Sequence, residues 1–423
     1  MKIKIFKAIG PLIAALVLVG LLVFLPFNVG VKYSDKQLTQ FAQNPRDLSI
    51  FTGYAIKSQA FEDPRFLPIL GSSELEHVNP FHPSAYFAKY NEGFTPYLSG
   101  QPGTTPLTQY FYVNSVAKQL QGRKLVFIIS PQWFSKQGTI ESEFDNFVSK
   151  GEIYSWLGSV DPQATTTAPM AKSLLTFKTL ESETTIHNAL KRLAKNQPLT
   201  AWQQLSISAS LQFWRKEDIL FSGLSQLKVG IGLSKTIDKA TKRLPNNPTQ
   251  EQLVQQADIE GAQAADNNPF QINNKVWTDK ISKVYKSRAN KMGKTTYLNS
   301  PEYRDMQQLL NLFAANKNDV LFLIQPVNGV WYHYSGLPES TLQSFSSKIK
   351  EQLTSQGFTN IADFTDMYNT PYAADDTIHF GYRGWLAADQ AIQKFMKKPS
   401  HTNYRLDNSR FLSKNWSTES TNY

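Results

Sequence analysis

Short apolar runs alternate with amphipathic segments in two parts of the chain. In the first part, this pattern predicts strands at 66–70, 94–98 and 125–129. It also predicts a helix that starts at 104–106, where threonine and proline suit an N-terminal cap and first turn. In the C-terminal third it predicts helices at 303–316, 342–353 and 386–396 and strands at 319–324 and 358–364. This alternation is typical of a parallel sheet with helices on its faces, so we expect an α/β fold.

The middle of the chain follows a different pattern. Residues 151–300 contain few strand-like runs and several helical ones, for example at 170–193. We therefore predict a helical insertion at about 151–300 within one α/β domain that spans 29–396. A separate helical domain is the alternative. The tail at 397–423 is polar, and we expect it to be poorly ordered.

A long apolar run lies at the N-terminus. No charged residue occurs from 8 to 31, and three lysines precede this run. A helix of this kind can cross a hydrocarbon core of roughly 30 Å. We predict a cytoplasmic N-terminus at 1–7, a single transmembrane anchor at 8–28 and an extracellular remainder, because basic residues favour the cytoplasmic side of a cell membrane. A cleaved signal peptide is the alternative, although the run is longer than a usual signal core and no A-x-A-like site follows it.

Composition narrows the possible chemistry. The 423 residues are 41% hydrophobic and 18% charged, which is apolar enough for a large core and excludes a wholly disordered chain. The lack of cysteine excludes disulfides, thiolate metal sites and cysteine nucleophiles. A net charge of +10 favours a membrane surface or a phosphate polymer as partner over nucleic acid, because no compact basic cluster is present. Since no glycine-rich phosphate loop occurs either, we expect hydrolysis or group transfer with no cofactor and no metal.

Two segments are candidates for nucleophilic catalysis, because each lies where an α/β sheet places its active site, near the carboxyl end of a strand. Ser72 and Ser73 follow the strand at 66–70, and either hydroxyl could face solvent on such a turn. Asp376 and His379 are three residues apart, so the carboxylate could accept from Nδ1 and leave Nε2 free to take a serine proton. The alternatives are a plain turn and a structural loop histidine.

Two further residues are candidate donors to an oxyanion. Gly103 lies at a predicted helix start, where a free backbone N–H and the helix dipole favour negative charge. Gln132 lies just past the strand at 125–129, and its side-chain amide could donate to the same oxygen. The alternatives are a glycine that the turn geometry requires and an ordinary surface glutamine.

In chain order, these residues resemble the SGNH/GDSL hydrolase family. The resemblance implies a flavodoxin-like, three-layer α/β/α fold with Ser73, Asp376 and His379 as the catalytic residues. It implies an oxyanion hole formed by Ser73, Gly103 and Gln132. Two positions depart from the family pattern, because Ser72 replaces an aspartate and Gln132 replaces the usual asparagine.

A narrower resemblance fits these departures. The N-terminal anchor and four segments are similar to the DltD family, the D-alanyl-transfer proteins of Gram-positive bacteria: Gly71–Leu75, Pro131–Phe134, Gln325–Tyr332 and Asp376–Tyr382. The resemblance implies a role in adding D-alanine to teichoic or lipoteichoic acid at the outer face of the membrane. It also implies a membrane O-acyltransferase, a D-alanyl carrier protein and a carrier ligase as members of the same system.

The function that this resemblance implies is a membrane-anchored serine acyltransferase or (thio)esterase. Ser73 would accept a D-alanyl group from an ester or thioester donor and pass it to the teichoic acid polymer. Three aromatic residues are candidate substrate contacts, with core packing as the alternative: Trp133, Trp331 and Tyr332. Two other functions stay open. One is a non-catalytic scaffold that presents carrier or polymer to a membrane O-acyltransferase, and the other is a cell-surface carbohydrate O-acetyl transferase or deacetylase.

Overall fold

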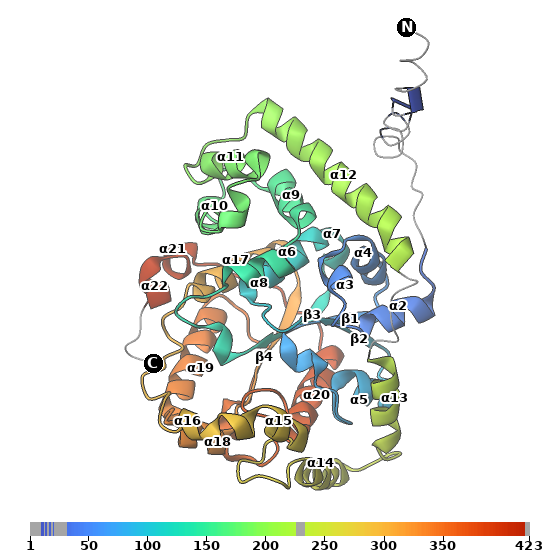
Figure 1. Ribbon diagram of the computed structural model, residues 1–423, viewed down its shortest axis with the longest axis vertical. Helices are drawn as coiled ribbons and strands as arrows, with labels where there is room; N and C mark the ends of the chain where they lie inside the picture. The colour runs from blue at the N-terminus through green and yellow to red at the C-terminus, as the bar shows by residue number, and fades with distance from the viewer. Residues whose placement is uncertain are drawn as a thin grey trace.

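The computed structural model describes residues 10, 11, 13, 14, 17, 20, 32–225 and 233–418. A five-stranded, fully parallel sheet lies at its centre, with the order β2-β1-β3-β4-β5 (Figure 1). The strands are β1 Phe66–Leu70, β2 Thr95–Ser99, β3 Lys124–Ile129, β4 Asp319–Ile324 and β5 Ile361–Asp363. The predicted α/β class and parallel sheet are confirmed. This strand order is that of flavodoxin-like sheets, in which the switch point lies between β1 and β3.

Both faces of the sheet are buried, because alternate residues of each strand pack against different helices. In β3, Phe127 and Ile129 face one layer, whereas Val126 and Ile128 face the other. The first layer contains α2 Asp35–Ala42, α3 Leu48–Thr52, α4 Ala55–Glu62, α6 Pro106–Ser115, α7 Ala117–Leu120, α17 Glu302–Ala315 and α19 Glu339–Thr354. The second contains α5 Pro83–Tyr90, α14 Gln250–Ala264 and α20 Tyr382–Lys397. The sheet thus lies between two helical layers.

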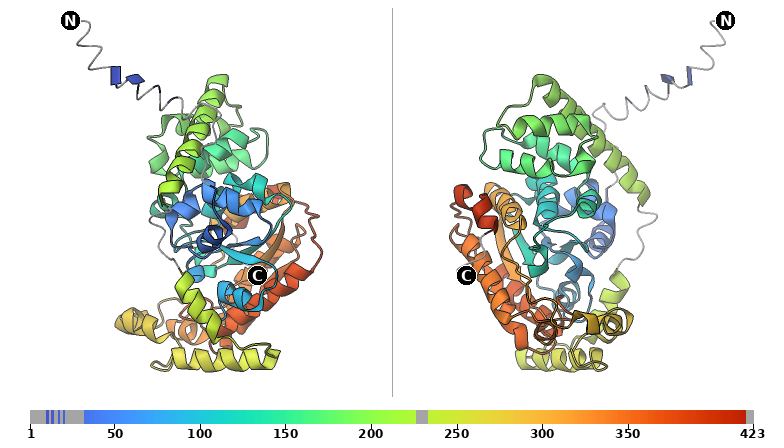
Figure 2. Two further views of the ribbon diagram at one scale, coloured as in Figure 1. Left: turned by 90° about the vertical axis from the view of Figure 1, so that its right-hand side faces the viewer. Right: turned by 60° about the vertical axis from the view of Figure 1, so that its left-hand side comes forward.

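Between β3 and β4, the described residues form helices and no strand. The α-helices here are α8 Glu141–Phe147, α9 Lys150–Ser159, α10 Thr167–Leu174, α11 Thr184–Leu193, α12 Ala201–Ser225, α13 Ser234–Arg243, α14, α15 Asn274–Asp279, α16 Tyr285–Arg288 and α17. Helices α9 to α12 form a group at one end of the molecule, and α14 lies at the opposite end (Figures 1 and 2). The helices between β3 and β4 therefore lie on both sides of the sheet.

The remaining elements are short. They are α18 Gly329–Ser335 after β4, and the 3-10 helices η1 Ser73–Glu76, η2 Pro131–Trp133, η3 Lys178–Leu180, η4 Ile281–Lys283 and η5 Thr365–Asn369. The last strand is shorter than the predicted range of 358–364. Phe358 stacks on Tyr404 with ring centroids 4.0 Å apart, so its side chain packs against the C-terminal segment before strand pairing begins.

The C-terminal segment differs from the prediction of a poorly ordered tail. Its described part forms two short helices, α21 Asn408–Phe411 and α22 Lys414–Thr418. Phe411 and Trp416 are buried in the first layer, with ring centroids 4.8 Å apart in an edge-on contact. These two aromatic side chains anchor a segment whose other residues are mostly polar, which explains why composition alone was misleading.

The predicted anchor at 8–28 lies almost entirely outside the described residues. Within the part of the chain that the structure describes, no helix has both the length and the apolar character needed to span a bilayer. The anchor therefore stays a prediction.

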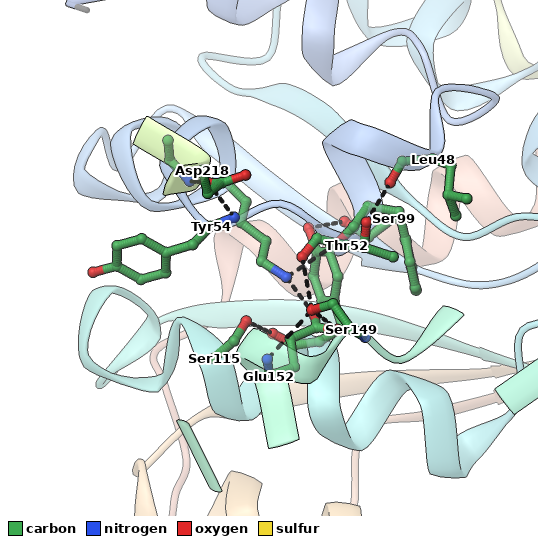
Figure 3. Close-up of polar contacts among 12 residues, drawn as sticks. Leu48, Thr52, Tyr54, Ser99, Ser115, Ser149, Glu152 and Asp218 are labelled. Carbon is green, nitrogen blue, oxygen red and sulfur yellow. Dashed lines mark hydrogen bonds and ion pairs between the residues drawn. The ribbon is translucent and has the colours of Figure 1, made fainter. Parts of the chain in front are cut away.

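A buried ion pair joins the insertion to the N-terminal helices. Lys57 of α4 donates to Glu152 of α9 at 2.6 Å and to the carbonyl of Phe51 at 3.0 Å. Asp218 of α12 accepts the backbone N–H of Tyr54 at 2.8 Å, at the start of α4 (Figure 3). The side chains of Lys57 and Glu152 are almost completely buried, so each depends on the other to remain charged.

Replacing Lys57 with methionine is expected to lower the free energy of unfolding by about 3–5 kcal/mol, because it leaves the buried carboxylate of Glu152 with hydrogen bonds from Ser149 but no cationic partner. Adding Glu152→Gln to the same chain removes the unpaired charge and should recover much of the loss. Urea unfolding of the full chain measures both effects. The exposed Lys118→Met variant is the control, with an expected change within about 0.5 kcal/mol. A change of that small size for Lys57→Met would contradict the role of the pair.

Candidate active site

Five predicted site residues lie in loops at the carboxyl edge of the sheet. Ser73 begins η1 after β1, Gly103 lies between β2 and α6, and Gln132 lies in η2 after β3. Asp376 and His379 lie in the loop between β5 and α20. Because parallel strands end at the same edge, these loops converge although they are far apart in the sequence.

The serine loop and the glycine loop touch each other. A Cβ atom on Gly100 would lie 2.1 Å from the carbonyl oxygen of Gly71, so this close approach of two backbones requires glycine. Thr104 Oγ1 donates to the same carbonyl at 2.7 Å. Ser72 Oγ donates to the carbonyl of Gln101 at 3.0 Å. These contacts hold the residues after β1 against those after β2.

The two candidate serines have different surroundings. The hydroxyl of Ser72 is buried and already donates to a backbone carbonyl. Ser73 is half-buried, and its Oγ lies 2.7 Å from Nε2 of His379. The geometry therefore favours Ser73 as the nucleophile over Ser72.

The loop after β5 orients the imidazole of His379. One carboxylate oxygen of Asp376 accepts the backbone N–H groups of Ile378 and His379 at 2.9 and 3.0 Å. The other oxygen lies 2.7 Å from Nδ1 of His379. The backbone N–H of Asp375 donates to the carbonyl of His379 at 2.8 Å, which closes the loop on itself. With Nδ1 facing a carboxylate, Nε2 is the ring atom available to Ser73.

The electrostatics of this pair suit proton transfer. Burial alone would raise the pKa of Asp376, but the charge and hydrogen bond of His379 hold it well below its ordinary value. Burial also disfavours the imidazolium form of His379, yet the charge and hydrogen bond of Asp376 outweigh it and raise the pKa of His379 above its ordinary value. Asp376 is thus ionised at neutral pH, and His379 is a stronger base than a free histidine.

Two neighbours of this pair were not predicted from the sequence. The ring of His77 stacks on that of His379, with centroids 4.3 Å apart and planes at 18°, and its Nδ1 lies 3.4 Å from Asp375. Glu74 is fully buried and accepts the backbone N–H of Ser72 at 2.6 Å. Burial raises the pKa of Glu74. The one sequence signal that could have pointed to His77 is a carboxylate, Glu74, three residues before it.

A cavity of about 370 Å³ opens beside Ser73 and contains the predicted oxyanion donors. Gly103 lines it in a left-handed conformation, with φ at +98°, and its backbone N–H donates to no group among the described residues. Ser73 is the first residue of η1, so no carbonyl within that helix accepts its N–H. Gln132 and Trp133 also line the cavity. These groups surround a space next to Ser73 Oγ that an acyl group could occupy.

Trp331 and Tyr332 were predicted as substrate contacts, but the structure does not place them in the wall of this cavity. Both side chains are buried in the first layer. Trp331 packs edge-on against Phe270 at 5.4 Å, and the Tyr332 hydroxyl lies 3.4 Å from that of Tyr297. Helix α18 turns these rings toward the interior, so they support the core below the site.

The site also contains three side chains of metal-ligand type. Ligand atoms of His77, Asp376 and His379 lie within 4.8 Å of one another. In the observed arrangement, however, both Asp376 oxygens accept N–H groups and both His379 ring nitrogens face hydrogen-bond partners. A cation bound here would have to displace the contact to Ser73 or to Asp376, so the geometry favours a proton relay.

The chain is similar to known proteins over most of its length. A family model described as DltD protein matches residues 43–397. The chain is 32% identical to a Protein DltD from Lacticaseibacillus rhamnosus over 99% of this chain and 97% of that protein. It is 32% identical to a Protein DltD from Bacillus subtilis (strain 168), over 92% and 97%, and 29% identical to one from Staphylococcus aureus (strain NCTC 8325 / PS 47), over 82% and 85%.

Proposed function

This chain belongs to the DltD family, and from that membership we propose that it is a membrane-anchored serine acyltransferase that moves D-alanyl groups onto teichoic acid. Proteins of this family take part in the D-alanylation of teichoic acids. The observation that carries the proposal is the 2.7 Å contact between Ser73 Oγ and Nε2 of His379, whose Nδ1 faces an ionised carboxylate.

In the first half-reaction, Ser73 Oγ attacks the carbonyl carbon of a D-alanyl ester or thioester. Nε2 of His379 takes the hydroxyl proton, and Asp376 stabilises the imidazolium that forms. The backbone N–H groups of Ser73 and Gly103, with the side-chain amide of Gln132, donate to the oxyanion. The bond to the donor's oxygen or sulfur then breaks, His379 returns its proton to that atom, and a D-alanyl-Ser73 ester remains.

In the second half-reaction, a hydroxyl of the polymer attacks the acyl-serine. His379 takes the proton of this hydroxyl, the bond between Ser73 Oγ and the acyl carbon breaks, and His379 reprotonates Ser73. The products are a D-alanyl ester of the polymer and the free serine. Water in place of the polymer hydroxyl would give hydrolysis by the same steps.

A second cavity offers a path for the acceptor. It has a volume of about 540 Å³, and Gln137 lines both this cavity and the one beside Ser73. Lys172, Arg304 and Asp305 lie in its wall, so two basic side chains and one carboxyl group are present near the catalytic loops. A polyol-phosphate chain carries regularly spaced negative charges, and the net charge of +10 favours its approach.

The N-terminal apolar run completes the proposal. A single-pass anchor would hold the catalytic domain at the outer face of the cell membrane, where the polymer and a membrane O-acyltransferase of the same system are accessible. A D-alanyl carrier protein of the same system would supply the acyl group.

Covalent trapping tests the proposed reaction. The full chain, mixed with a D-alanyl thioester and quenched in acid, is expected to gain the mass of one alanyl unit on the peptide that contains Ser73. The Ser72→Ala chain should gain it as well, whereas Ser73→Ala should not. An adduct from the acetyl thioester alone would favour the carbohydrate O-acetyl alternative. The absence of any adduct, with normal D-alanylation in cells that carry Ser73→Ala, would leave the scaffold function instead.

A further inference from the structure

Glu143 is a charged residue in the wall of an otherwise neutral cavity. Of the thirteen described residues that line the cavity beside Ser73, all others have uncharged side chains. Glu143 lies in α8 and is half-buried. Within the described chain it forms no ion pair, so the cavity contains a negative charge that no basic side chain neutralises.

The carboxylate of Glu143 lies close to the oxyanion site. Its Oε2 accepts the backbone N–H of Ile140 at 3.2 Å, which caps the start of α8. Its Oε1 lies 3.4 Å from the position that a Cβ atom on Gly103 would occupy. One oxygen therefore has a structural contact, whereas the other lies against Gly103, whose N–H donates to no group among the described residues.

We propose that Glu143 binds the α-ammonium group of the acyl unit and so selects an aminoacyl group over a plain one. This inference rests on the proposed function, because it assigns a ligand to the same cavity. In a D-alanyl group the ammonium nitrogen is two bonds from the carbonyl carbon that Ser73 attacks. An oxyanion held at Gly103 therefore places the ammonium group within reach of a carboxylate beside Gly103.

The chemistry of an ammonium group and a carboxylate agrees with this assignment. An ammonium group needs an anionic acceptor when it leaves water, and a charge-assisted hydrogen bond is the strongest that a side chain can offer it. Acetyl and propionyl groups carry no charge and gain nothing from Glu143. A carboxylate near a developing oxyanion also slows acylation unless a cation lies between the two charges, and the ammonium group of the substrate supplies that cation.

Binding and turnover together test the ammonium subsite. D-Alaninamide and propionamide differ in the ammonium group, and their binding to the full-length Ser73→Ala chain is measured by ligand-observed NMR. We expect D-alaninamide to bind and Glu143→Gln to weaken it about ten- to hundredfold, the size of a hydrogen bond to a charged group. In the chain that retains Ser73, Glu143→Gln should lower kcat/KM for a D-alanyl thioester by a similar factor. It should leave kcat/KM for the propionyl thioester unchanged or raise it, because the repulsion between the Glu143 carboxylate and the oxyanion is removed.

The choice of Glu143→Gln and of its control separates an effect on ligand binding from an effect on folding. Glutamine keeps the acceptor for the N–H of Ile140, so the cap of α8 is retained. Glu141→Gln is the matched control, because Glu141 lies in the same helix and accepts the backbone N–H groups of Lys178 and Thr179 outside the cavity. This control should change neither binding nor turnover.

Each outcome separates the subsite from the proposed reaction. D-Alaninamide binding that depends on Glu143, without turnover of any thioester, would support the subsite and remove the proposed function. Turnover of the D-alanyl thioester that Glu143→Gln does not change would support the function and overturn the subsite. Equal losses for the D-alanyl and propionyl thioesters would show that Glu143 acts on the fold of the loop. A failure of D-alaninamide to bind would also overturn the subsite.

Discussion

Replacing Ser73 with alanine is expected to lower the rate of acyl transfer by about 10⁴- to 10⁶-fold, the loss seen when a serine nucleophile is removed from a histidine-activated site. The variant keeps the cavity and the oxyanion donors but has no atom that can form the acyl intermediate. The rate is measured with the full chain and a D-alanyl thioester, and D-alanine on the polymer is measured in cells.

The adjacent serine provides the control for this variant. Ser72→Ala removes a buried hydroxyl that donates to the carbonyl of Gln101, so it should lower the free energy of unfolding by about 1 kcal/mol. Its rate of acyl transfer should stay within about tenfold of the unsubstituted chain, because the hydroxyl near Nε2 of His379 is that of Ser73 and is retained. The reverse result, in which Ser72→Ala is inactive and Ser73→Ala is active, would assign the nucleophile to Ser72.

Replacing Asp376 with asparagine is expected to lower kcat/KM by about 10⁴-fold with little change in the fold. Asparagine can still accept the backbone N–H groups of Ile378 and His379 through its oxygen. Its amide group would then face Nδ1 of His379 as a donor. The neutral imidazole would have to carry its proton on Nε2, and Nε2 could no longer take the proton of Ser73.

The pH dependence gives a second readout of the same variant. The base form of His379 is neutral, so the rate falls as the pH drops through its pKa, which the carboxylate of Asp376 raises above the ordinary value. Loss of that carboxylate lowers the pKa, and the acid limb of the remaining activity should move to lower pH. Asp375→Asn is the comparison, because this carboxylate lies 3.4 Å from Nδ1 of His77 and its charge raises the pKa of His379 less than that of Asp376 does, so the acid limb should move less. An acid limb that stays in place in Asp376→Asn would exclude Asp376 as the partner of the base.

Much of the fold was predictable because its strands are buried on both faces. Such strands appear in the sequence as short apolar runs between turns, and β1 and β4 occupy exactly the predicted ranges of 66–70 and 319–324. The edge strand β5 was predicted too long, because an apolar run does not reveal that Phe358 packs against Tyr404. The packed C-terminal segment was missed for a similar reason, since two aromatic residues are enough to bury an otherwise polar tail.

The candidate site was predictable where a residue's role depends on its neighbours in the chain. Asp376 and His379 are three residues apart, and Ser73 and Gly103 each follow an apolar strand. A residue that reaches the site from a helix elsewhere in the chain has no such neighbour in the sequence to mark it. Glu143 lies in α8, ahead of the predicted insertion, and it reaches the cavity only because α8 packs beside the loop that holds Gly103.

The sequence by itself determined the parallel sheet, the loops at its carboxyl edge and the chemical types of the side chains in those loops, because these follow from local apolar periodicity and turn chemistry. The tertiary structure alone decided which side chains meet. It brought Ser73 within 2.7 Å of a histidine 306 positions later, turned Trp331 and Tyr332 into the core, and left Glu143 facing an otherwise neutral cavity. Distances between residues so far apart in the chain depend on how the helical layers pack on the sheet, and no local pattern encodes that packing.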